Sequence, residues 1–138
     1  MITADQVRQV AMSLPRTTEG LVRDRVKFYI GRIVYVAISP DETTMGFGFP
    51  KEERAALIAS EPDKFFMPIK SEERYNWVES WMAALDPGEM REYVIDAWCM
   101  VVAKKVSAAY LAGLPVPEPS PPSRTGSRSR VPRPRRPR

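Results

Sequence analysis

Apolar side chains near the amino terminus recur every three or four positions, at Val7, Val10, Ala11 and Leu14. This spacing places them on one face of an α-helix and predicts a helix over about residues 4–14. Thr3 can cap the helix, with Gln6 as the reciprocal partner in a capping box. Pro15 is expected to end it.

Between residues 26 and 49 the pattern changes to alternation, which predicts three strands over 26–30, 33–38 and 44–49. Gly31-Arg32 separates the first two strands and suits a type II′ hairpin turn. The second strand is apolar on both faces, which favours a central position in the sheet. The third alternates large apolar residues with Thr44, Gly46 and Gly48, so one of its faces should be almost bare.

Three further elements follow. A helix is expected from Pro50 to just before Pro62, and a strand over 77–82 with Trp77, Glu79 and Trp81 on one face. Asp86, Pro87 and Glu89 form a second capping-box signature and predict a long helix to about Leu111. Because the hairpins are tight, the sheet should be antiparallel. The predicted fold class is α+β: one antiparallel sheet of about four strands, packed by helices in the order helix-β-β-β-helix-β-helix.

Charge divides the chain into two parts. The whole sequence contains 21 basic and 17 acidic residues, a net charge of +4. Residues 115–138 hold seven arginines, one acid and eight of the fourteen prolines, whereas residues 1–114 carry a net charge of −2. The carboxy-terminal segment has only two apolar side chains, Val116 and Val131, too few to offset the entropy of ordering it. We therefore expect an α+β domain over 1–114 and a disordered Pro/Arg-rich tail over 115–138.

Several function classes are disfavoured by composition. The sequence has no histidine and one cysteine, Cys99, which removes histidine-based catalysis, histidine metal ligation and an internal disulfide. It has no apolar run of membrane-spanning length and no signal-peptide pattern at its start. These features favour a cytoplasmic protein that is not an enzyme and holds no cofactor or metal.

A set of short segments, in the same order and at similar spacing, resembles the MmcQ/YjbR family of small bacterial proteins. The segments are Leu14-Pro15 with Thr18-Glu19, the hairpin over 28–34, the segment over 61–66, Trp77-Val78, Leu85-Asp86, Asp96-Ala97-Trp98, Ala103-Lys104-Lys105 and Ala108-Ala109-Tyr110. Arg16 replaces the glycine that is usual after Leu-Pro. The resemblance implies a CyaY-like α+β fold, described as double-wing, and DNA binding by analogy of shape. It supplies no catalytic or base-recognising motif. Iron binding is disfavoured, because the first helix offers only Asp5 as an acid.

The leading functional hypothesis is weak, largely sequence-independent DNA binding. Candidate contacts in the domain are basic residues close to aromatic ones: Arg23, Arg25, Lys27, Arg32 and Arg74. Candidate contacts in the tail are Arg124, Arg128, Arg130, Arg133, Arg135, Arg136 and Arg138. An ordinary solvated surface is favoured for the domain's basic residues because its net charge is slightly negative. For the tail, a solvating segment without a partner is as plausible as a binding arm, and RNA or acidic protein would suit the same charge.

The alternative hypothesis is a module that binds a small ligand or a protein through an aromatic sheet face. Tyr75 and Trp77 are its candidate residues. Phe66 and Trp81 are expected to belong to the hydrophobic core instead.

Overall fold

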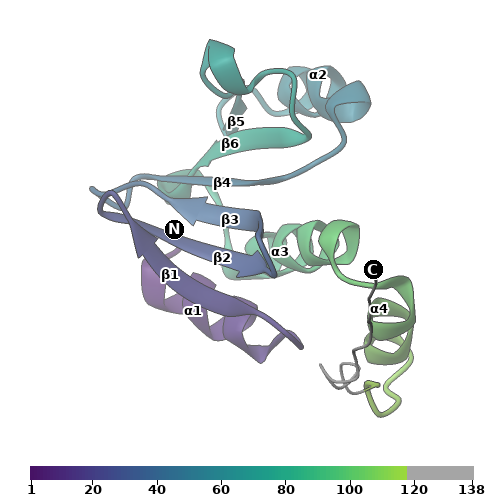
Figure 1. Cartoon of the computed structure of the whole chain (residues 1–138). Helices are drawn as coiled ribbons and strands as arrows, with labels where there is room; N and C mark the ends of the chain where they lie inside the picture. Colours follow the sequence, from purple (N-terminus) through teal and green to yellow (C-terminus); the bar gives the residue numbers. More distant parts are fainter. Residues whose placement is uncertain (118–138) are drawn as a thin grey trace, which may run out of the picture.

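A six-stranded antiparallel sheet forms the centre of the protein, with strand order β1-β2-β3-β4-β6-β5 (Figure 1). The structure is a computed structural model that describes residues 1–117. The strands are β1 (Thr18–Val22), β2 (Arg25–Ile30), β3 (Ile33–Ile38), β4 (Thr44–Gly48), β5 (Phe65–Phe66) and β6 (Trp77–Trp81). The helices are α1 (Ala4–Ser13), α2 (Lys51–Ser60), α3 (Pro87–Val101) and α4 (Lys104–Leu111), with short 3₁₀ turns η1 (Lys70–Glu72) and η2 (Met82–Ala84). The predicted α+β class with a single antiparallel sheet is confirmed.

Local signals in the sequence locate the starts of α1 and α3 and one turn correctly. Thr3 and Gln6 form the predicted capping box of α1, and Asp86 and Glu89 form that of α3. Gly31 has a φ of +61° at the first position of the β2–β3 turn, as a type II′ hairpin requires.

The sheet has six strands rather than the predicted four. β1 was missed because its side chains are largely exposed and so show no alternation of apolar and polar residues. The turn that joins it to β2 has positive φ at both central residues, Arg23 (54°) and Asp24 (65°). This is type I′ geometry, which an Asn-Gly pair usually indicates in a sequence. An Arg-Asp pair gives no such signal. β5 was missed because it is only two residues long.

The predicted last helix is in fact two helices. α3 ends at Val101, and Val102 and Ala103 have extended backbone with ψ of 156° and 139°. The neighbouring β-branched residues Val101 and Val102 weaken a helix at this point. The break redirects α4 so that the ring of Tyr110 packs edge-on against Trp98, 5.1 Å away.

Helices α1 and α3 cover one face of the sheet and enclose the hydrophobic core (Figure 1). Fully buried side chains from both layers meet there, among them Val7, Phe28, Phe47, Val94 and Trp98. Helix α2 packs at the opposite end, beside β5 and β6. The other face of the sheet has no helical layer over β2, β3 and β4, and it carries the candidate site.

The chain stays against the domain as far as Pro117. Val116 packs against the core, and the guanidinium of Arg16 donates a hydrogen bond to the carbonyl oxygen of Pro117 at 2.8 Å. The ordered chain thus extends past Leu114, where the tail was expected to begin. The disorder predicted for the rest of the tail falls on residues 118–138, outside the described part of the chain.

A candidate binding groove on the open face of the sheet

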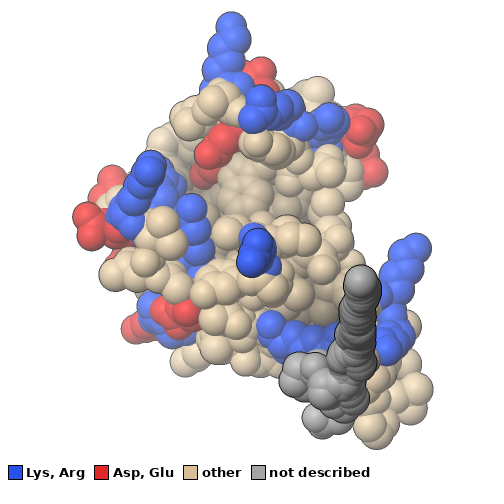
Figure 2. Space-filling view, viewed as in Figure 1, with Lys and Arg blue, Asp and Glu red and all other residues tan. Residues whose placement is uncertain are grey.

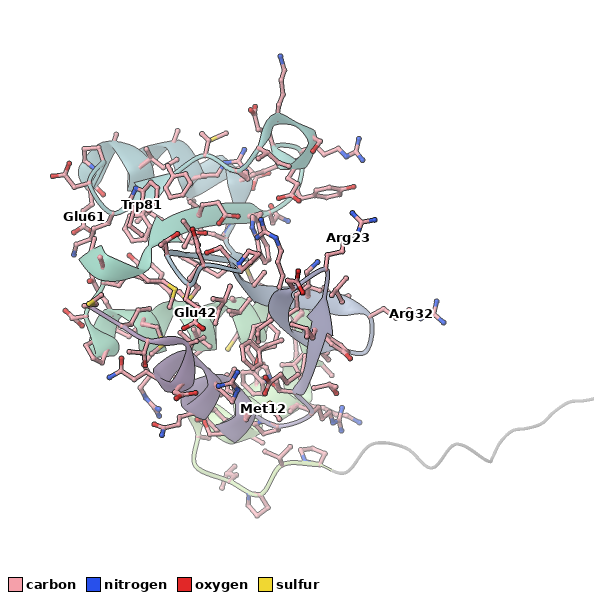
Figure 3. All side chains as sticks on the ribbon, turned by 90° about the vertical axis from the view of Figure 1, so that its left-hand side faces the viewer. Met12, Arg23, Arg32, Glu42, Glu61 and Trp81 are labelled. Carbon is pink, nitrogen blue, oxygen red and sulfur yellow. The ribbon has the colours of Figure 1, made fainter. Side chains whose placement is uncertain are left out.

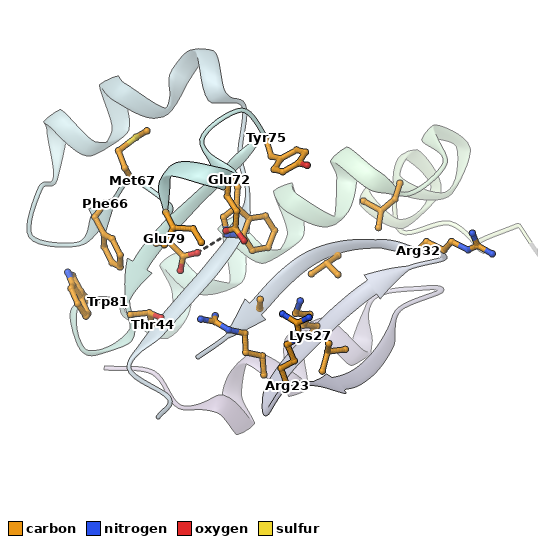
Figure 4. A pocket seen from close by; sticks show the side chains of 17 residues that line it. Arg23, Lys27, Arg32, Thr44, Phe66, Met67, Glu72, Tyr75, Glu79 and Trp81 are labelled. Carbon is orange, nitrogen blue, oxygen red and sulfur yellow. Dashed lines mark hydrogen bonds between the residues drawn. The ribbon is translucent and has the colours of Figure 1, made fainter. Parts of the chain in front are cut away.

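A groove of about 810 Å³ lies on the sheet face that the helices leave open (Figure 4). One side is formed by β2, β3 and the β1–β2 turn, and the other by β6 and the segment over 66–75. Figure 2 shows a hollow in which uncharged side chains predominate, with both basic and acidic side chains at its border. The basic residues do not join into one continuous stripe on this face. Aromatic side chains on one side and basic side chains on the other suit a ligand that has both a flat apolar part and an anionic part.

The floor of the groove follows one row of cross-strand partners. Lys27 on β2 pairs with Ala37 on β3, Ala37 with Gly46 on β4, and Gly46 with Glu79 on β6. Adjacent strands are about 4.8 Å apart, so the Cα atoms of Lys27 and Glu79 are separated by roughly 14 Å. Ala37 contributes only a methyl group to the floor, whereas the space above Gly46 is taken by the side chains of Trp77 and Glu79.

Aromatic side chains form the β6 side of the groove. Phe66 and Trp81 stack with their ring centroids 4.6 Å apart and their planes at 29°, and they face each other in Figure 4. Trp81 is 44% exposed, because the same sheet face that carries Glu79 also carries Trp81. The expectation that Phe66 and Trp81 belong to the core is therefore wrong. Tyr75 and Trp77, the predicted ligand-face residues, line the same groove.

Glu79 is held at the centre of the groove by Trp77. The indole Nε1–H of Trp77 donates a hydrogen bond to Oε2 of Glu79 at 2.8 Å. Burial raises the pKa of the Glu79 carboxyl, and the Trp77 hydrogen bond and the positive charge of Arg25 partly oppose this rise. Glycine at position 46 makes the arrangement possible, since a Cβ there would lie 2.5 Å from the indole nitrogen and 2.6 Å from Oε2.

The backbone of the aromatic side is fixed by a buried arginine. The guanidinium of Arg54 on α2, only 7% exposed, donates hydrogen bonds to three carbonyl oxygens. These are Glu73 at 2.8 Å, Tyr75 at 3.2 Å and Trp77 at 2.9 Å. One side chain therefore positions the whole segment that carries Tyr75 and Trp77.

Four of the predicted basic residues come together on the opposite side of the groove: Arg23, Arg25, Lys27 and Arg32. Among residues 1–117, none of the four forms an ion pair or a side-chain hydrogen bond. Arg23 and Arg32 project from this edge of the molecule toward solvent (Figure 3). Four cations without intramolecular partners are available to an anion.

Arg74 does not join the four basic residues. Its guanidinium carbon lies 4.9 Å from the ring centroid of Tyr75, and its Nη2 donates to the Tyr75 hydroxyl at 2.8 Å. It supports the aromatic side of the groove instead. The seven tail arginines predicted as contacts lie outside the described residues.

The described residues offer few groups for metal binding, membrane insertion or nucleophilic catalysis. Within residues 1–117, no group of three acidic or cysteine side chains is arranged to hold a metal ion. Over the same range, no helix is both long and apolar enough to cross a bilayer. Burial raises the pKa of the Cys99 thiol on α3, which makes it a poor nucleophile.

Sequence reasoning missed three residues that shape the groove: Gly46, Arg54 and Glu79. The alternation of β6 placed Glu79 between two tryptophans, and the bare face of β4 was predicted. What could not be seen was that β4 and β6 are neighbours, which brings Gly46 beneath the Trp77–Glu79 pair. Arg54 was not singled out, because nothing local in the sequence distinguishes it from the other charged residues of α2.

A single antiparallel sheet with helices on one face and a groove on the other defines a small α+β domain, which is the predicted fold class. The chain belongs to the YjbR family, whose family model matches residues 12–100. It is also similar to the crystal structure of the Deinococcus radiodurans protein DR2400, a DUF419 domain. That similarity has a TM-score of 0.66 at 18% identity and covers 83% of this chain and 91% of the other. A comparison with curated proteins finds no match.

Proposed function

We propose that this protein is a non-enzymatic nucleic-acid-binding protein whose groove holds an unpaired stretch of DNA. One observation carries the proposal. Four cations that form no ion pair within residues 1–117 line one side of a groove whose other side carries exposed aromatic rings. This combination matches a strand that offers flat bases on one side and phosphates on the other.

The aromatic side favours single strands over a duplex. The bases of a duplex are stacked on each other and cannot reach rings such as Trp77 and Trp81. An unpaired base can stack on them, a contact that contributes about 1–3 kcal/mol per base. Arg23, Arg25 and Lys27 would then contact the phosphates, which orient the strand without specifying its sequence.

The basic tail would add affinity without selecting a sequence. Its seven arginines suit phosphate contacts, and their attraction should fall with increasing salt. Nothing in this arrangement calls for a catalytic residue: the groove has one carboxylate at its centre and no histidine beside it. The proposal is therefore one of binding alone.

Fluorescence anisotropy tests the proposal. A labelled single strand of mixed sequence and its duplex would be titrated with the full-length protein at low and moderate salt. We expect tighter binding to the single strand, and salt-dependent binding to both. An Arg25→Gln/Lys27→Gln double variant should bind the single strand more weakly, whereas Arg91→Gln, an exposed arginine on α3, should not. Absence of salt-dependent binding to either DNA would overturn the proposal.

A small aromatic anion is the second candidate ligand. The groove volume of about 810 Å³ falls in the range usual for small-molecule sites. Calorimetric titration with free nucleoside monophosphates separates the two candidates. Binding of a monophosphate as tight as that of the oligonucleotide would favour the small ligand, and much weaker binding would favour the strand.

A further inference from the structure

Glu79 is the feature of the groove that charge neutralisation and stacking do not explain. It lies at the centre of a site proposed to bind an anionic strand, where its charge repels phosphate. Its Oε2 accepts the hydrogen bond of Trp77, and its Oε1 accepts none from the described residues. Figure 4 shows the carboxylate directed into the hollow, between Phe66 and the β2–β3 side. A carboxylate fixed by one oxygen therefore presents the other to whatever enters.

An ionised carboxylate only accepts hydrogen bonds. A ligand group that meets Oε1 must therefore be an N–H or O–H donor. Nucleobases differ at this point: cytosine carries an amino group at position 4, and uracil and thymine carry a carbonyl oxygen there. The amino group pairs with a carboxylate, whereas the carbonyl oxygen is repelled by it.

Building on the proposed binding of a single strand, we propose that Glu79 selects a nucleobase that carries an exocyclic amino group. Such a base would stack on the aromatic side of the groove and donate its amino N–H to Oε1. Ala37 lines the groove with only a methyl group, which leaves room for the base edge between the carboxylate and the basic side. The groove then has a base preference in addition to its sequence-independent attraction for phosphate.

A purely supporting role for Glu79 would affect the binding of different bases in another way. If it served only to orient Trp77, substitutions would change affinity for all bases equally. The ratio of affinities for two matched bases separates the roles, because a supporting role does not alter it.

Labelled oligo(dC) and oligo(dU) of equal length provide the test, since their pairing edges differ in the amino and carbonyl groups at position 4. Full-length protein should bind oligo(dC) about tenfold more tightly than oligo(dU). In Glu79→Gln the amide oxygen stays with Trp77 and the amide NH2 faces the ligand, where it donates to the uracil oxygen and cannot accept from the cytosine amino group, so the ratio should fall to one or reverse. The glutamine keeps an oxygen for Trp77, and far-ultraviolet circular dichroism would verify the fold. Glu92→Gln changes an exposed carboxylate on α3, outside the groove, and should leave the ratio unchanged.

Three results would overturn the inference. Equal binding of the two oligonucleotides by the unmodified protein would remove the base preference while leaving single-strand binding intact. A preference that survives in Glu79→Gln would assign it to another residue. Failure of both oligonucleotides to bind would reject the proposed function itself, together with the inference that depends on it.

Discussion

The indole of Trp77 and the carboxylate of Glu79 form a hydrogen-bonded pair, 2.8 Å between Nε1 and Oε2, that lies over the backbone of Gly46. The two residues are on β6, two positions apart, and Gly46 is the β4 partner of Glu79. The pair occupies the space that a side chain at position 46 would need. The geometry of the groove therefore depends on the absence of one methyl group.

Gly46→Ala should displace the Trp77–Glu79 pair. The new Cβ would lie 2.5 Å from the indole nitrogen and 2.8 Å from Cε2 of the same rigid ring, so the tryptophan must move. We expect affinity for a single-stranded oligonucleotide to fall about tenfold, because a stacking contact is lost. Anisotropy titration measures the affinity, and near-ultraviolet circular dichroism reports the displaced indole.

Gly48→Ala is the matched control for that variant. It makes the same substitution on the same strand, but its Cβ would meet Ala97 at 3.6 Å, an ordinary contact. Affinity should stay close to that of the unmodified protein. If Gly46→Ala also bound the oligonucleotide normally, the Trp77–Glu79 pair would have no part in binding.

Arg54→Met should destabilise the fold and disorganise the aromatic side of the groove. The substitution leaves the carbonyl oxygens of Glu73, Tyr75 and Trp77 without their shared donor. Hydrogen bonds to a charged donor contribute about 1.5–3 kcal/mol each, and partial access of water to these carbonyls reduces the loss. We expect the free energy of unfolding, measured by urea titration, to fall by roughly 2–4 kcal/mol.

Arg91→Met serves as the control, because Arg91 is exposed on α3. Its unfolding free energy should change by less than about 0.5 kcal/mol. A stable Arg54→Met protein with normal oligonucleotide binding would contradict the positioning role of Arg54.

Much of the fold could be predicted because its signals are local. The capping residues Thr3 and Asp86, the period of α1 and the glycine-first turn at Gly31 each act within a few residues. β1 gave no such signal, because an edge strand with both faces exposed needs no alternation, and the Arg23-Asp24 turn lacks glycine. The break after Val101 was missed because the apolar period continues through Val101 and Val102, and the contact of Tyr110 with Trp98 that accompanies the break is not a local signal.

The groove could be predicted only in pieces. Arg25, Lys27, Tyr75 and Trp77 were identified as candidates from residue type, and the structure brings them to one hollow. Their meeting depends on the order β2-β3-β4-β6, which the alternation of single strands does not encode. Trp81 was misplaced in the core, since an exposed tryptophan is unusual unless a site requires it.

Tyr35 should make stability fall at alkaline pH. Its side chain is fully buried, shares a hydrogen bond with the Thr17 hydroxyl at 2.7 Å, and has a pKa raised by burial to about 12. The unfolded chain has a tyrosine pKa near 10, so it releases the proton first. The stabilising effect is complete below about pH 10 and is lost as pH rises from about 10 to 12, by roughly 2–3 kcal/mol.

Urea titrations at pH 8 to 12 would measure this loss, with Tyr35→Phe as the comparison. The phenylalanine variant lacks the ionising group, so its stability should fall less over the same interval. Its stability at neutral pH should be lower by about 1 kcal/mol, the value of the lost hydroxyl hydrogen bond. Parallel curves for the two proteins would show that Tyr35 does not govern the alkaline transition.

Both the groove and the tail should contribute to the salt dependence of DNA binding. Truncation after Pro117 removes the seven tail arginines and keeps the contact between Arg16 and Pro117. For single-stranded DNA the log–log salt slope is about −0.7 per phosphate neutralised. With only the four groove cations, the truncated protein should show a slope no steeper than about −3. The full chain, with its tail arginines, could reach a slope of about −8.

Anisotropy titrations across a range of salt concentrations would give both slopes. We expect the truncated protein to bind more weakly at low salt but to keep its preference for single strands, because the aromatic rings remain. The tail supplies charge without stacking surfaces, so its removal should reduce duplex binding more than single-strand binding. Identical slopes for the two proteins would show that the arginine tail makes no contact with DNA and that the groove alone determines affinity.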